Sequence, residues 1–152
     1  YMARMMEGGE DLRFIARRIV ICAAEDVGMA DPQALVIANA AAQGADFVGW
    51  PEARIPLAEA VCYIATAPKS NASYMAIDAA LSDVRKRSCG NVPKHLRDAH
   101  YPGAAALGHG LTYKYPHDFP GGWVEQQYLP DELVGTRYYV PTGRGRDLDN
   151  KK

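Results

Sequence analysis

The sequence predicts an all-α fold, a small helical bundle followed by an irregular, aromatic C-terminal arm. Three observations carry this prediction. In the first 90 residues, apolar side chains recur three or four positions apart, the spacing of an amphipathic helix. Glycines and prolines interrupt these segments at intervals typical of helix lengths. After Gly90 the helical spacing is lost, and tyrosine, proline and glycine dominate the chain.

The first two helices are marked by a glycine stop and an acidic cap. Residues 1–7 are predicted to be helical, and Gly8-Gly9 ends that helix. Asp11 is the expected N-cap of a second helix that runs to Gly28. Its apolar stripe contains Leu12, Ile15, Ile19 and Cys22.

Glu25 and Asp26 would lie in the last turn of this second helix, where negative charge opposes the helix dipole. A structural role is therefore expected for both, with a compensating partner nearby. The candidates are Arg17 or Arg18, two turns earlier, and the open amides of the following helix.

Asp31-Pro32 is a sharp start signal for a third helix, because an N-cap acid precedes a proline at the first helical position. The helix that follows is rich in alanine. Its predicted packing stripe has almost no side-chain bulk, so another helix can approach closely. The stripe contains Ala34, Ala38, Ala41, Ala42 and Ala45.

Two further helices complete the predicted bundle. The segment Gly49–Glu52 breaks the pattern and starts a new helix that runs to Ala67. Pro56 is expected to cause an irregular first turn or a kink in this helix. Pro68 ends this helix, and Ser70 is expected to cap the last one. The inward face of the last helix is predicted to contain Tyr74, Ile77, Leu81 and Val84.

These patterns divide the chain into a helical bundle over residues 1–98, an irregular arm over 99–142 and a tail over 143–152 that is expected to be disordered. The arm belongs to the same domain and should pack on the bundle or on a partner. Residues 138–140 are compatible with one short strand. The aromatic residues of the arm form a candidate oligomer interface, because tyrosine and tryptophan bury a large area and keep a polar group. They are Tyr113, Tyr115, Phe119, Trp123 and Tyr128.

The net charge of −1 hides an asymmetry, since residues 84–152 carry eleven Lys and Arg against seven acids. A tight basic cluster opens this part. It is either a solvated helix end, with cations placed well against the helix dipole, or a nucleic-acid contact through phosphates. The cluster consists of Arg85, Lys86, Arg87, Lys94 and Arg97.

No catalytic, cofactor-binding or metal-binding residue is predicted. The nearest match to a phosphate loop, residues 103–108, lacks the lysine and the hydroxyl that contact nucleotide phosphates. Three widely spaced cysteines indicate inert thiols in a reducing compartment. The weakest alternative is a small enzyme with a site among His109, His117 and Asp118. No apolar run reaches the roughly 20 residues of a membrane helix, so a cytoplasmic location is expected.

Several strings of the sequence, in one order over nearly the whole chain to about Tyr139, resemble the C-terminal domain of the RarA/MgsA family. This family comprises the replication-associated recombination proteins A, and its eukaryotic relatives are the Werner-helicase-interacting proteins. The strings are 1–5 (YMARM), 8–11 (GGED), 14–18 (FIARR), 25–32 (EDVGMADP), 67–71 (APKSN), 92–97 (VPKHLR), 115–118 (YPHD) and 127–133 (QYLPDEL).

The resemblance implies a parent AAA+ ATPase akin to clamp loaders that acts at stalled replication forks. The family's nucleotide motifs belong to its N-terminal module and have no counterpart here, so ATP and magnesium are expected only in the parent. The helical C-terminal region resembles a clamp-loader collar and assembles the family's proteins into tetramers. The start at Tyr1, within a predicted helix, is what an excised fragment would show.

The expected function is therefore oligomerisation and scaffolding of a replication-associated AAA+ ATPase. The resemblance implies self-association as a homotetramer, DNA contact mainly through the parent, single-strand DNA-binding protein among the partners, and a place at the bacterial nucleoid. Two alternatives come from the residues themselves: a DNA-binding module that uses the basic cluster, and the small enzyme described above.

Overall fold

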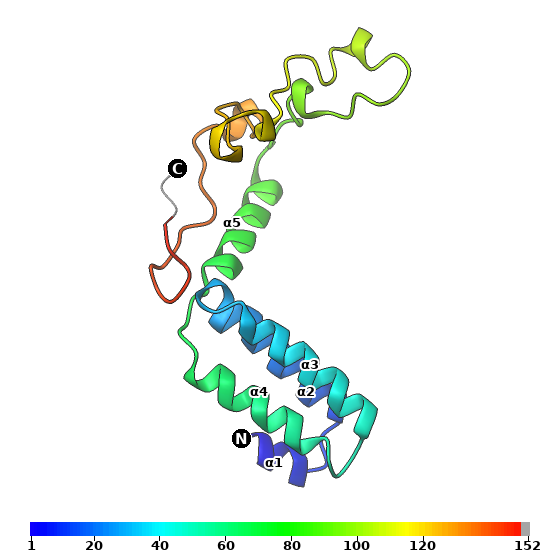
Figure 1. Cartoon of the computed structure of the whole chain (residues 1–152), viewed down its shortest axis with the longest axis vertical. Coiled ribbons are helices and arrows are strands. Elements are labelled where there is room, and N and C mark those ends of the chain that lie inside the picture. The colour runs from blue at the N-terminus through cyan, green and yellow to red at the C-terminus, as the bar shows by residue number, and fades with distance from the viewer. Residues whose placement is uncertain (150–152) are drawn as a thin grey trace. The chain divides into compact units, whose positions relative to one another are not determined.

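The computed structural model describes residues 1–149 and confirms the all-α prediction, with no strand in that range. Figure 1 traces the helices along the chain. They are α1 (Met2–Glu7), α2 (Leu12–Cys22), α3 (Gln33–Val48), α4 (Arg54–Thr66) and α5 (Ala72–Lys86). One π-helical turn (Ala23–Val27) follows α2, and the 3-10 turns are Gly28–Ala30, Lys94–Leu96, Ala105–Leu107, Pro116–Asp118, Pro120–Gly122 and Asp131–Leu133. None of the described helices is both long and apolar enough to cross a membrane.

The chain forms two compact units. The first contains Tyr1–Ala79 together with the C-terminal segment from Tyr138, and the second contains Ala80–Arg137. This division differs from the predicted boundary at residue 98. Helix α5 is shared between the units, and the C-terminal segment returns to the first unit. The predicted short strand at residues 138–140 is not formed, and these residues have no regular secondary structure.

The core of the first unit is built by α2, α3 and α4, which pack on one another along their lengths (Figure 1). The buried residues of α3 are all alanines: Ala34, Ala38, Ala41 and Ala45 are each at most 6% exposed. Because alanine adds a single methyl group, the backbones can approach closely. The predicted alanine stripe is confirmed at these four positions, and the opposing helices supply the larger side chains, including Ile15, Ile19, Leu57 and Ile64.

Acidic residues specify where two of these helices begin. The Asp11 carboxylate accepts the backbone N–H of Phe14 at 2.8 Å, which makes it the N-cap of α2. Helix α3 begins at Gln33, one residue later than expected. The Asp31 carboxylate accepts the Gln33 N–H at 3.2 Å and the Tyr63 hydroxyl at 2.7 Å. Asp31 therefore provides a hydrogen-bond acceptor for a free N–H at the start of α3 and links that helix to α4.

The end of α2 differs from the continuous helix that the sequence predicts. The α-helix ends at Cys22, and a π-helical turn and a 3-10 turn follow. Gly28 has a φ of +48°, and a Cβ there would lie 2.5 Å from the carbonyl oxygen of Ser70. The Ser70 N–H donates to the Val27 carbonyl at 3.2 Å. The altered winding therefore lets the segment before α5 approach the backbone directly, at a site where only glycine fits.

Of the two outcomes expected at Pro56, an irregular first turn or a kink, the structure has the irregular first turn: the Ile55 N–H donates to the Glu52 carbonyl at 2.9 Å, the spacing of a 3-10 turn, and the Leu57 N–H lies 3.5 Å from the Ala53 carbonyl. Helix α4 begins at Arg54, so Pro56 is its third residue. The N–H groups of a helix's first turn have no acceptor within the helix. The absence of an N–H on Pro56 therefore costs no hydrogen bond of the helix. Helix α4 then runs to Thr66, just before Pro68.

The prediction that α5 buries a face of larger side chains is wrong. Tyr74, Ile77, Leu81 and Val84 are 43%, 55%, 40% and 66% exposed, and Ala72 is the buried residue of the helix. The periodicity correctly predicted an apolar stripe on a helix. It could not say whether another element covers that stripe.

The expected disordered tail also differs from the structure over residues 143–149. Asp147 is 1% exposed, and the Arg146 N–H donates to the Ala30 carbonyl at 2.8 Å. Gly145 fits tightly against Ala30 and Pro68, because a Cβ there would lie 2.2 Å from the Ala30 oxygen. The remainder of the predicted tail, residues 150–152, lies outside the described residues.

Candidate interaction surfaces

The predicted aromatic interface is part of a loop closed by one glutamine. The side-chain amide of Gln126 accepts the Lys114 N–H at 3.2 Å and donates to the Lys114 carbonyl at 2.9 Å. This pairing resembles that of a neighbouring strand backbone. The Lys114 ammonium also donates to the Glu125 carbonyl at 3.2 Å. Residues 115–125 are therefore held as a loop by contacts at its base.

All five aromatic residues of the predicted interface lie in or beside this loop, which we call the aromatic loop (residues 113–128). Each is partly exposed, between 37% and 53%. The Tyr115 ring lies 5.1 Å from the ring of His117, and the Tyr128 hydroxyl accepts a hydrogen bond from Gln126 at 3.1 Å. The loop thus offers aromatic surface from Tyr113, Tyr115, Phe119, Trp123 and Tyr128 on a base fixed by hydrogen bonds.

The basic cluster divides into residues with different surroundings. Arg85 and Lys86 are exposed in the last turn of α5, where cations complement the helix dipole. The Arg87 guanidinium donates to the Asp83 carboxylate at 2.5 Å, one turn earlier on the same helix, and to the Glu132 carbonyl at 3.5 Å. Arg87 therefore ties the end of α5 to a later segment of the second unit.

Lys94 is exposed, whereas Arg97 is half-buried. The Arg97 guanidinium donates to the Val92 carbonyl at 2.7 Å and contacts the His109 Nε2 at 3.4 Å. Because arginine can only donate, this geometry makes Nε2 the acceptor. The other ring nitrogen, Nδ1, lies 2.6 Å from the Tyr101 hydroxyl. Arg97 and His109 therefore hold together the turns of the second unit.

The residues of the alternative enzyme site have separate partners. His109 contacts Arg97 and Tyr101, whereas His117 lies against the ring of Tyr115. Among residues 1–149, no group of three or more histidine, cysteine, aspartate or glutamate side chains is close enough to hold a metal ion.

Asp147 forms a polar cluster that sequence analysis missed. Its carboxylate accepts the Ser70 hydroxyl at 2.6 Å, the Thr142 N–H and the Thr142 hydroxyl at 2.8 Å each, and the Tyr139 hydroxyl. Ser70 Oγ in turn accepts the Ala72 N–H at 3.3 Å, at the start of α5. Ser70 thus has its expected place at this helix start, and it also anchors the C-terminal segment.

The electrostatics of this cluster follow from burial and hydrogen bonding. Burial alone would raise the pKa of the Asp147 carboxyl, but the hydrogen bonds from Ser70, Tyr139 and Thr142 outweigh it and hold that pKa well below its usual range. The hydrogen bond to Asp147, with burial and its negative charge, raises the pKa of the Tyr139 phenol to about 12. Asp147 is therefore charged and Tyr139 neutral over the physiological range.

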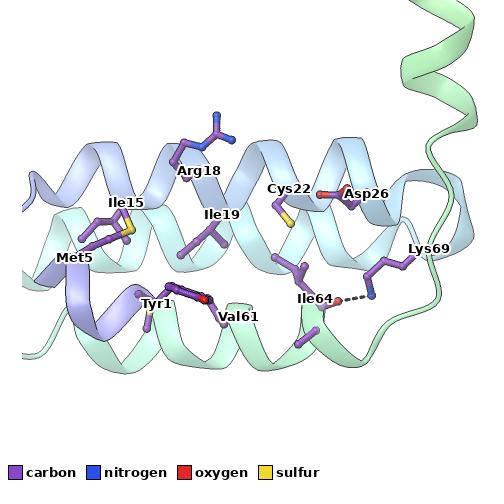
Figure 2. Close-up of a pocket in the computed structure, with 12 residues that line it drawn as sticks. Tyr1, Met5, Ile15, Arg18, Ile19, Cys22, Asp26, Val61, Ile64 and Lys69 are labelled. Atoms are coloured by element: carbon purple, nitrogen blue, oxygen red, sulfur yellow. Dashed lines mark hydrogen bonds between the residues drawn. The ribbon is translucent and has the colours of Figure 1, made fainter.

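An apolar groove of about 470 Å³ lies between α2 and α4, with α1 across one end (Figure 2). Ile15, Ile19 and Cys22 line it from α2, and Val61 and Ile64 line it from α4. Figure 2 shows the guanidinium of Arg18 directed away from the groove at its rim.

The two acids Glu25 and Asp26 lie in the π-helical turn, and Asp26 borders the groove. Burial, a hydrogen bond to Asp26 and the charge of Asp26 raise the pKa of the Cys22 thiol to about 11. The Lys69 charge acts in the opposite direction and thus lies near this pair. Among the described residues, neither Arg17 nor Arg18 forms a salt bridge with these acids, and Asp26 instead lies beside the Cys22 thiol, with Lys69 near this pair.

Lys69 also completes the end of α4. Its ammonium donates to the Ile64 carbonyl at 2.7 Å and to the Ala67 carbonyl (Figure 2). These groups belong to the last turn and the C-cap of α4, where a cation is favourable against the helix dipole. The lysine is thus placed as a structural cap at the far end of the groove.

Two residues that organise these surfaces, Gln126 and Asp147, were not singled out from the sequence. Glutamine in an irregular segment gives no pattern that would indicate its role. For Asp147, the nearby glycines Gly143 and Gly145 offered a weak signal, because closely spaced glycines also occur in tight turns. Its partner Ser70 is 77 residues away in the sequence.

Comparison with protein families defines the class of protein. The chain matches, over residues 1–152, a family model described as MgsA AAA+ ATPase C terminal. The chain belongs to this family. It therefore corresponds to the C-terminal domain of an AAA+ ATPase, and the family's ATP-binding module lies outside its residues. The resemblance found in the sequence strings is confirmed.

Individual proteins of known sequence are similar to this chain over nearly its whole length. The chain is 59% identical over 149 residues to an uncharacterized AAA domain-containing protein of Mycobacterium tuberculosis, covering 98% of this chain and 33% of the relative. It is 55% identical over 146 residues to the replication-associated recombination protein A of Bacillus subtilis, with 96% and 34% covered. For the Escherichia coli protein of the same name, the identity is 43% over 146 residues, with 95% and 33% covered. The chain thus spans about a third of the length of these relatives.

Proposed function

We propose that this chain is the oligomerisation and scaffold domain of a replication-associated AAA+ ATPase. In this proposal the complete protein binds ATP and magnesium in its other domains and acts on DNA in replication and recombination. The name shared by the relatives from Bacillus subtilis and Escherichia coli supports the association with replication and recombination.

The observation that carries the oligomerisation role is the aromatic loop. Its five aromatic side chains are exposed by more than a third, although each could bury a large area. Exposed apolar groups on a fixed base mark surfaces that partners cover. A symmetric assembly would cover the same loop on every copy.

Light scattering after size exclusion, over a tenfold range of concentration, tests this proposal. We expect a mass of about four times the 16.6 kDa of the chain, independent of nucleotide. The double variant Phe119→Ser, Trp123→Ser should reduce that mass. Leu107→Ser, which changes a 57% exposed residue outside the loop, is the matched control and should leave the mass unchanged. A single species at the monomer mass throughout would refute the proposal.

A DNA contact is the second candidate, favoured by the exposure of Arg85, Lys86 and Lys94. If these residues neutralise phosphates, the triple change to glutamine should weaken binding evenly across DNA sequences. Each lost contact should reduce the log–log salt slope on duplex DNA by about 0.9. Arg4→Gln in α1 is the control, and absence of binding by the unchanged chain at low salt would exclude this candidate.

A further inference from the structure

The apolar groove between α2 and α4 continues from the point where α1 begins. Tyr1, Met2 and Met5 line one end of it. Figure 2 shows Tyr1 between α2 and α4, near Val61, with Cys22, Ile64 and Lys69 farther along the same groove. The lining is predominantly aliphatic, and Ala65 leaves room at its α4 wall. The described part of the chain thus fills only one end of this apolar surface.

Helix α1 is short, and its hydrogen bonding begins at the Tyr1 carbonyl. The Tyr1 carbonyl already accepts the Met5 N–H at 3.1 Å, so helical hydrogen bonding includes the first residue. No side chain of the described residues caps α1, whereas Asp11 caps α2. A six-residue helix is also too short to be stable without support, because helix nucleation is unfavourable.

The relatives contain enough additional polypeptide to fill the apolar groove. The chain matches the C-terminal part of the proteins of this family, and the relatives described above are about three times as long as this chain. In those proteins, polypeptide precedes the position of Tyr1. A helical backbone continuing from Tyr1 in the reverse direction would follow the axis of α1, which Figure 2 shows entering the space between α2 and α4.

We propose that the groove binds the segment directly preceding Tyr1 in the complete protein. This segment would continue α1 by about two further helical turns. The apolar face of this segment would lie on Ile19, Cys22, Val61 and Ile64. Because Met2 and Met5 pack against the core, the positions three and four residues before Met2 should carry apolar side chains, in line with the helical repeat. The domain core would then be completed by the polypeptide that connects it to the rest of the protein.

Cys22 provides a direct test, because its thiol lines the groove. In a Cys62→Ser, Cys89→Ser background, Cys22 is the single thiol, and its alkylation rate by a maleimide can be compared in two versions. One begins at Tyr1, and the other begins about 15 residues earlier in the complete protein. We expect Cys22 to react at least about tenfold more slowly in the longer version, since access limits thiol reactivity. Exposed Cys62, alone in the matching background, should react equally in both.

A second measurement does not depend on thiol chemistry. Ala65→Glu places a charge in the groove wall and should lower the melting temperature of the longer version more than that of the version beginning at Tyr1. Ala79→Glu, at an exposed alanine of α5 outside the groove, is the matched control and should affect both versions alike. Equal Cys22 rates in the two versions, or equal effects of Ala65→Glu, would overturn the proposal. Protection of Cys22 that appears only at high concentration of the shorter version would also overturn it, because a second copy would then be the occupant.

Discussion

The interactions that stabilise the first unit of this chain differ from those that stabilise the second. Of the 18 buried hydrophobic residues among those described, 15 belong to the first unit, and the second unit contributes only Ala104, Val124 and Leu133. The second unit instead relies on side chains that bind backbone groups, such as Gln126 at Lys114 and His95 at the Gln127 carbonyl. The first unit should therefore unfold as one cooperative core, whereas the second should respond locally to the loss of single contacts.

The largest expected effect is in the helical core. Leu57 is fully buried, so Leu57→Ala removes apolar contacts and leaves a cavity. The free energy of unfolding should fall by about 2–5 kcal/mol, as for other buried leucines. Urea denaturation followed by far-ultraviolet circular dichroism measures it. Ile55→Ala, at a 60% exposed position of the same helix, is the control. A small effect of Leu57→Ala would show that α4 is not part of a cooperative core.

The next effect concerns the anchor of the C-terminal segment, because Asp147→Ala removes the carboxylate that accepts hydrogen bonds from Ser70, Tyr139 and Thr142. We expect a loss of about 1.5–3 kcal/mol of unfolding free energy, the range for hydrogen bonds to a charged group. Arg144→Ala, in the same turn and exposed, should change little. Since the pKa of Asp147 is depressed, its contribution is present above the ordinary aspartate pKa and should decline as the pH falls below it. An equal difference from the variant at all acidic pH values would contradict this assignment.

A smaller and local effect is expected in the second unit. Gln126→Ala removes both hydrogen bonds to the Lys114 backbone and should destabilise the closed loop by about 1 kcal/mol. Limited proteolysis should cut within residues 114–126 faster, while the helical dichroism and its thermal transition stay nearly unchanged. Gln43→Ala on α3 is the control for loss of a surface glutamine. A fall in the main thermal transition equal to that of a core variant would show that the units are not independent.

The smallest effect concerns Tyr139 at alkaline pH. Its pKa is raised to about 12 by the hydrogen bond to Asp147, above the ordinary tyrosine value of about 10. The proton is thus favoured in the folded state, and the stabilisation is complete below pH 10 and lost as the pH rises through 12. The stability difference between the unchanged chain and Tyr139→Phe should be constant below pH 10 and shrink above it. A difference that is constant across this whole range would mean that Tyr139 titrates normally.

The sequence by itself determined most of the first unit, because its signals are local. A cap such as Asp11 acts on amides three residues away, and the alanine stripe of α3 repeats within one or two helical turns. The family resemblance followed from strings of residues and needed no structure.

Tertiary structure decided what no local pattern can specify. The stripe of α5 that includes Ile77 is apolar by its sequence, but its exposure depends on which other elements cover it. The winding at Gly28 follows from the approach of Ser70, and the C-terminal turn is fixed because Asp147 meets that same serine, 77 residues away in the chain. The glycines near Asp147 suit a flexible tail and a tight turn equally. A buried carboxylate with several donors makes the turn the stable choice, and those donors are brought together only by the folded chain.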